Sequence, residues 1–164
     1  MSRTTYDDTT GYYWAPTIAA QGAPTVAEMT AAQKLTCEIS DFPDLAEKSG
    51  TVEVPSLCSR FTGKIAGRIT VDDATMSFYW DDAPASDSQD IRALLAQDAE
   101  GFLVRVDAVS GAIPPVTSAG TKVDVWPATV TSNSKNAPAF GEAKKFTVGV
   151  TITAPPSVDV AVVA

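Results

Sequence analysis

The chain has 164 residues, 45% of them hydrophobic and 20% charged, with 12 basic and 20 acidic side chains and a formal net charge of −8. This length and composition indicate one globular domain over residues 1–164 and exclude a disordered or membrane-spanning chain. The acidic balance excludes a protein that grips nucleic acid, because affinity for phosphates is driven by Lys and Arg. The start lacks an apolar signal core, which indicates a cytosolic protein without a membrane anchor.

The chain contains no histidine, which removes the Ser-His-Asp and Cys-His constellations and the commonest neutral metal ligand. Neither GxGxxG nor GxxxxGK[ST] occurs, so the usual nucleotide-binding loops are missing. Adjacent acids could divide acid and base roles, but these ones fall where Asp favours turns. The pairs are Asp7 with Asp8, Asp72 with Asp73, and Asp81 with Asp82. We expect no enzyme, cofactor or metal site, although a Ser-Lys or Asp-Asp site stays open.

The two cysteines, Cys37 and Cys58, do not form a CxxC motif, and one pair is not a disulfide framework. Free cysteines commonly behave as small buried hydrophobes. We expect two reduced thiols, with a single bridge left open because only its geometry could decide.

The first part of the chain is predicted to be irregular. Residues 1–33 are expected to form an arm with at most one short helix, because Pro16 and Pro24 interrupt it. The stretch KLTCEIS, from Lys34, alternates as a first strand does. Residues 41–63 contain two prolines and two glycines and little periodicity, which predicts a long functional loop.

The middle of the chain carries clearer local signals. GKIAGRITVDDATMSFYWDD, residues 63–82, predicts a β-hairpin that turns at its central aspartates. A flanking α-helix is predicted at about residues 87–98, where Ser86 and Gln89 fit a capping box and Gly101 fits a stop. Its apolar stripe is Ile91, Leu94 and Leu95.

Three later stretches, FLVRVDAV, TKVDVWPATVT and KKFTVGVTIT, alternate as strands with one buried face. In the last of them the buried side chains would be Phe146, Val148, Val150 and Ile152. Six or more strands with one helix favour a mainly β fold, an antiparallel β-sandwich or small barrel with one flanking helix.

In their order and spacing, four stretches resemble the tail tube proteins, or major tail proteins, of long-tailed bacteriophages. The stretches are GYYWAPTIAAQGAPTVAEM, VEVPSLCSRFTGKIAGRITV, MSFYWDD with DIRALLAQDAEGFLVRV, and KVDVWPATVTSNSKNAPAFGEAKKFTVGVTITAPP. The resemblance covers nearly the whole chain and is nearest to phages with non-contractile tails that infect actinobacteria. Some relatives carry a C-terminal immunoglobulin-like domain, which we do not expect here.

The resemblance implies a structural virion protein, assembled in the host bacterial cytoplasm, whose hexameric rings stack into a hollow tail tube. Its partners would be further copies of itself, a tape-measure protein, a baseplate or initiator complex and a tail terminator protein. Genomic DNA would pass through the lumen into the host without specific binding. Carboxylates lining that lumen would repel phosphates, in keeping with the net charge.

Two sets of residues are candidates for assembly. Apolar residues of the arm and the predicted loop would form the subunit interface: Tyr12, Tyr13, Trp14, Leu45, Val52, Val54, Leu57 and Phe61. Arm and loop would become ordered on assembly, because ordering costs roughly 1 to 2 kcal/mol per residue. A lumen or inter-sheet face would be formed by Lys145, Thr147, Thr151 and Thr153.

Two other kinds of function stay open. A tail terminator or a capsid decoration protein would place a similar β fold in single rings or isolated spikes. A carbohydrate-binding β-sandwich module would use an aromatic platform made of Tyr12, Tyr13, Trp14, Tyr79 and Trp80.

Overall fold

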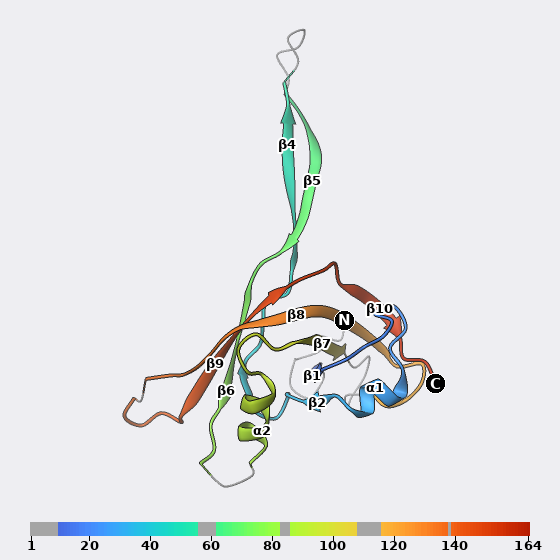
Figure 1. Ribbon diagram of the computed structural model, residues 1–164. Coiled ribbons are helices and arrows are strands. Elements are labelled where there is room, and N and C mark those ends of the chain that lie inside the picture. Colours follow the sequence, from blue (N-terminus) through green and yellow to red (C-terminus); the bar gives the residue numbers. More distant parts are fainter. Residues whose placement is uncertain (1–9, 56–61, 83–85, 108–115, 138) are drawn as a thin grey trace, which may run out of the picture.

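The computed structural model describes residues 10–55, 62–82, 86–107, 116–137 and 139–164, and its main feature is one curled antiparallel sheet (Figure 1). The strand order is β2-β1-β7-β8-β9-β6-β3, with β10 beside β8. The strands are β1 Thr10–Ala15, β2 Gln33–Lys34, β3 Ile39–Asp41, β6 Ala74–Tyr79, β7 Glu100–Asp107, β8 Lys122–Lys135, β9 Lys145–Ile152 and β10 Ser157–Ala161. This half-barrel confirms the prediction of a mainly β, antiparallel fold.

The centre of the sheet is buried on both faces. Strand β8 directs Val123 and Val125 into one apolar cluster and Trp126 and Val130 into another, because successive side chains of a strand point to opposite faces. The larger cluster fills the concave side, where Phe78 stacks on Phe146 with ring centroids 5.0 Å apart. Burial on both faces explains why β8 reads VDVWPATV, with few polar positions.

Helix α2, Asp87–Leu94, covers the larger cluster and confirms the predicted helix in a shorter form. Its residue Ile91 is fully buried, and so is Leu95, which follows the helix. Asn133 of β8 donates hydrogen bonds to the carbonyl oxygens of Arg92 (3.0 Å) and Leu95 (2.7 Å) and so satisfies the end of the helix. The helix ends on this side chain and does not need a terminal glycine.

Ser86 is the N-cap residue of α2, but the predicted capping box and the predicted stop at Gly101 were wrong. The hydroxyl of Ser86 makes no capping bond to the helix and instead donates to the carbonyl oxygen of Asp81 at 3.3 Å. Gly101 lies inside β7, under the ring of Trp14. The capping box occurs instead at α1, Val26–Thr30, between Thr25 and Glu28. No helix among the described residues is long and apolar enough to cross a membrane.

The N-terminal segment differs from the predicted arm. Residues 10–15 form β1, which pairs with β7 from Thr10↔Asp107 to Ala15↔Phe102 and lies next to the centre of the sheet. The short helix expected in this segment is present as α1. The prolines that suggested an arm lie after β1, so they interrupt the chain without preventing the strand.

The predicted strand KLTCEIS is divided by a turn. Strand β2 ends at Lys34, β3 begins at Ile39, and the turn between them exposes Cys37. Leu35 and Ile39 are nevertheless buried, so the apolar spacing reflects two separate contacts with the core.

The predicted loop at 41–63 and the predicted hairpin at 63–82 are both corrected. Strand β4, Glu47–Val54, occupies the loop and pairs with β5, Gly63–Val71, as a separate two-stranded sheet. Strand β6 pairs with β9 and β3, not with β5. Asp72 and Asp73 therefore connect two sheets. Local turn residues do not show whether the strands on either side of a turn pair with each other, because pairing depends on partners distant along the chain.

The close packing at Gly101 yields a stability prediction. A Cβ atom there would lie 2.6 Å from Cζ2 of Trp14 and 2.9 Å from the carbonyl oxygen of Ala15. We expect Gly101→Ala to lower the free energy of unfolding by about 2 to 3 kcal/mol, because the buried ring cannot move aside without strain. Urea denaturation measures this. Gly22→Ala is the matched control, because nothing lies within 4 Å of its Cβ position, and an equal loss in both variants would contradict the argument.

The capping box yields a pH prediction. Hydrogen bonds from the backbone N–H groups of Ala19 (2.7 Å) and Thr25 (2.8 Å) lower the pKa of the Glu28 carboxyl. A lowered folded-state pKa stabilises the fold above the unfolded value of 4.5, and this contribution is lost as pH falls through the folded value. Glu28→Gln should cost about 1 kcal/mol at pH 7 and less at pH 3, measured by urea unfolding. Glu100→Gln is the exposed control, and an equal cost at both pH values would contradict the role of the charge.

Candidate subunit interface

The β4–β5 hairpin projects from the sheet as an isolated ribbon (Figure 1). Its register runs from Glu47↔Val71 to Val54↔Gly63, with an irregularity between Ser49 and Thr51. Directly opposite residues of an antiparallel pair share a face, so the register assigns every side chain of the ribbon to one of two faces.

One face of the hairpin is polar and carries an ion pair. On this face Lys64 lies 3.4 Å from Glu53. At the base of the hairpin, beyond the irregularity, Lys48 pairs with Asp72. Both ion pairs are well exposed, so each contributes little to stability. Hydrogen bonding to the Asp72 carboxylate raises the pKa of Lys48. This face suits contact with water.

The other face of the hairpin, named here the ribbon face, is apolar and uncovered. Its large side chains are Val52, Val54 and Ile65, which are between 47% and 58% exposed. Ile69 is exposed as well, but it pairs with Ser49 beyond the irregularity and so does not belong to this face. A lone two-stranded ribbon is marginally stable in water, and adjacent exposed apolar residues commonly mark an interaction site. A covering surface would remove these side chains from water.

The predicted interface residues are divided by the fold. Val52 and Val54 lie on the ribbon face. Tyr12, Trp14 and Leu45 are buried in the chain's own larger cluster, so in this fold they are not presented to a neighbour. Tyr13 is half-buried and packs against the smaller cluster on the opposite face of β1. Leu57 and Phe61 lie outside the described residues, as does Cys58.

The four residues predicted to line a lumen or a second sheet all belong to β9 or to the residue after it. Thr147 donates to Asn136 Oδ1 (2.8 Å) and Thr151 donates to Asp73 Oδ1 (2.7 Å). Lys145 lies 5.1 Å from the ring centroid of Tyr79, and Thr153 is exposed. Their neighbours across the sheet include Ser77, Ser134 and Thr129, so the face is rich in hydroxyl groups.

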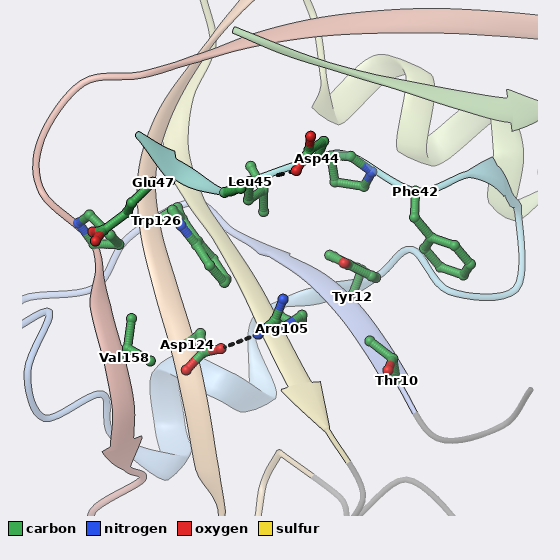
Figure 2. Close-up of a pocket in the computed structure, with 13 residues that line it drawn as sticks. Thr10, Tyr12, Phe42, Asp44, Leu45, Glu47, Arg105, Asp124, Trp126 and Val158 are labelled. Carbon is green, nitrogen blue, oxygen red and sulfur yellow. Dashed lines mark hydrogen bonds and ion pairs between the residues drawn. The ribbon is translucent and has the colours of Figure 1, made fainter. Parts of the chain in front are cut away.

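A pocket of about 610 Å³, named here the strap pocket, lies beneath residues 42–47, which cross over β1, β7 and β8 (Figure 2). Tyr12, Leu45 and Trp126 form apolar walls, and Phe42 and Val158 stand at the mouth with more than half of their surface exposed. The Trp126 Nε1 group is buried and finds no acceptor among the described residues. The pocket surface is therefore mainly apolar.

The floor of the strap pocket holds an ion cluster. Arg105 donates to Asp124 Oδ2 at 2.7 Å, and its Nε lies 3.2 Å from Asp107 Oδ2. Asp124 also accepts from the backbone N–H of Asp159 (2.8 Å), which joins β10 to the cluster. The guanidinium lies 5.3 Å from the ring of Trp126. Because partners surround these charges, the cluster is a structural support rather than a reactive centre.

The candidate metal and sugar sites are not assembled in the part of the chain that the structure describes. Among the described residues no group of three or more Cys, Asp or Glu side chains could hold a metal ion. The aromatic residues proposed as a sugar platform are separated, because Trp14 is fully buried and Trp80 is covered by Lys135, whose Nζ lies 4.1 Å from the ring centroid. Sequence reasoning missed the strap pocket, since its lining comes from five segments that are distant along the chain.

Comparisons with solved structures find chains with a similar fold. The chain is similar to one in a structure described as the sheath/tube terminator of an extracellular contractile injection system (TM-score 0.61, 9% identity, 94% of each chain). It is also similar to a chain of the anti-feeding prophage baseplate (0.59, 10%, 94% of this chain and 95% of the other). A third similar chain comes from the tail of a gene transfer agent particle (TM-score 0.56, 12% identity, 95% of this chain and 98% of the other). At these identities the likeness shows the fold alone.

A search of curated protein sequences gives no significant match. The model of the family described as phage tail tube protein, in contrast, matches residues 1–164, the whole of the sequence. Together with the mainly β fold, this match shows that the chain belongs to the phage tail tube protein family, the structural proteins of phage tails.

Proposed function

We propose that six copies of this chain close into a ring and that the rings stack into the tail tube through which the phage genome reaches the host. The observation that carries the proposal is the ribbon face, a row of exposed apolar side chains on a projecting hairpin. A monomer gains nothing from such an arm, whereas a polymer of identical subunits gives each arm a surface to cover it.

The energetics favour a role for the hairpin in joining copies. Covering one half-exposed Val or Ile contributes roughly 1 kcal/mol, so the three ribbon-face residues together contribute about 3 kcal/mol. Neither apolar cluster of the body includes any of them. The arm can therefore be used for assembly without removing anything from the core. We propose that this arm, rather than an aromatic N-terminal arm, carries the ring-to-ring contact.

The lumen remains part of the proposal. The hydroxyl-rich face of β9, with Lys145, Thr147, Thr151 and Thr153, is the proposed lining or inter-sheet surface. Its hydroxyl groups are uncharged, so apart from Lys145 this face lacks the cations that drive affinity for phosphates. The net charge of −8 opposes retention of DNA as well. We further propose a tape-measure protein, a baseplate or initiator and a terminator as partners, and assembly in the host cytoplasm.

The tail type and host are also proposals. A non-contractile tail and an actinobacterial host rest on the resemblance in composition, which is rich in Ala, Thr, Val and Pro. A tail terminator is the second candidate function, because one solved relative is described as a tube terminator. Negative-stain electron microscopy of concentrated protein, with and without initiator and tape-measure protein, distinguishes the two. Stacked tubes support the tail tube, and single rings under all conditions support the terminator.

The ribbon face yields an assembly prediction. The double variant Val52→Ser and Ile65→Ser removes one directly opposed apolar pair. We expect it to raise the protein concentration needed for tube formation by about tenfold or more, because covering the ribbon no longer removes apolar surface from water. Sedimentation measures the polymer, and thermal unfolding of the body should stay unchanged.

The matched control lies on the opposite face of the hairpin. Thr51 and Ala66 are the neighbouring opposed pair, so Thr51→Ser with Ala66→Ser changes the same two strands without touching the ribbon face. Equal assembly by both double variants would contradict the proposed contact.

A further inference from the structure

A single aromatic side chain stands clear of the body on the connection between β8 and β9. Phe140 is fully exposed, and the next residue, Gly141, has φ +81°, a conformation that makes a tight turn at that point. The base of the connection is fastened: Asn136 N–H donates to the carbonyl oxygen of Lys145 (3.0 Å), and Lys144 pairs with Asp82. The phenyl ring is therefore presented to solvent from an anchored turn.

The strap pocket is a matching cavity. Its volume of about 610 Å³ exceeds what one phenyl ring fills, so it has room for the backbone of the turn as well. Phe42 and Val158 at its mouth are exposed apolar residues that a ring could cover.

The charges around the two features are opposite in sign. The strap pocket is lined by Asp44, Glu47 and Asp124 against Arg105, a sum of −2. The surroundings of the Phe140 turn are lined by Lys135, Lys144, Lys145, Asp82 and Glu142, a sum of +1. Complementary charge of this kind orients two surfaces as they meet and disfavours other pairings.

The two features cannot meet within one chain. In Figure 1 the β8–β9 connection extends on the far side of the body from the β4–β5 hairpin, whereas the strap pocket includes Glu47 at the base of that hairpin. A projection and a cavity on different sides of one molecule join successive copies head to tail.

From these observations we infer that Phe140 of one copy inserts into the strap pocket of the next copy in the assembly. The inference rests on the proposed function, because it requires copies of the chain to be joined. It adds a contact that is distinct from the ribbon face and that uses neither of its strands.

The first test is removal of the phenyl ring of Phe140. Phe140→Ala should raise the concentration needed for assembly by about tenfold or more, measured by sedimentation, because the apolar contact is lost. Phe140→Leu should recover part of the loss. The fold is not at risk, since Phe140 touches neither apolar cluster. Val163→Ala, an exposed apolar truncation elsewhere, is the control, and equal assembly of wild type and Phe140→Ala would overturn the inference.

The second test is a cross-link that keeps Phe140 in place. In a background of Cys37→Ser and Cys58→Ser, Ala139→Cys is combined with Val158→Cys, and assembled protein is oxidised and run on a non-reducing gel. The inference expects a ladder of covalent multimers. Ala139→Cys with Val163→Cys is the control pair and should give none.

The outcomes separate the two proposals. If tubes form but the Ala139→Cys and Val158→Cys pair gives no cross-link, the inference is overturned and the proposed function stands. The same holds if a ladder forms instead from the pair Val54→Cys and Val158→Cys. That result would mean that a neighbour's hairpin occupies the strap pocket. Failure of the wild type to form tubes, even with initiator and tape-measure protein, overturns the proposed function and the inference together.

Discussion

The fold depends on one long strand that is buried on both faces. Strand β8 spans Lys122–Lys135, a length of roughly 45 Å at the usual rise of a strand, and its side chains enter both apolar clusters. Its first half holds Asp124 and Trp126 in the strap pocket, and its second half carries the chain outward to the connection with Phe140. The strand therefore joins the two surfaces that we propose to meet between copies, and the rigidity of the core sets the distance between them.

The ribbon contact that we propose for assembly lies outside the part of the molecule that forms the core. The body is closed by apolar contacts such as the Phe78–Phe146 stack and by the ion cluster around Arg105. The β4–β5 hairpin makes no contribution to those clusters, yet exposes four large apolar residues. A subunit built in this way can fold alone, and the apolar surface of its hairpin is removed from water only on contact with a neighbour. This division agrees with a protein that must remain unassembled until its partners are present.

The sequence predicted what local periodicity controls. Strands β7, β8 and β9 and helix α2 were foreseen, and so was the burial of Phe146, Val148 and Val150, because alternation and helical spacing are visible in a single stretch. The candidate site was foreseen only in part, through Val52 and Val54. The pairing of β5, the end of α2 and the place of β1 were not, because each depends on a partner distant along the chain.

The sequence by itself determined a mainly β chain of tail tube type. The reason is that the alternation of side chains and the order of the elements can be read along the chain without knowing which residues are in contact. Only the tertiary structure decided which apolar residues remain uncovered. Tyr12 and Val52 both lie in strands, but Tyr12 is 5% exposed within the larger cluster, whereas Val52, in the β4–β5 hairpin, is 52% exposed. Exposure is a property of the whole arrangement, because burial is set by what packs on a residue and not by its own side chain.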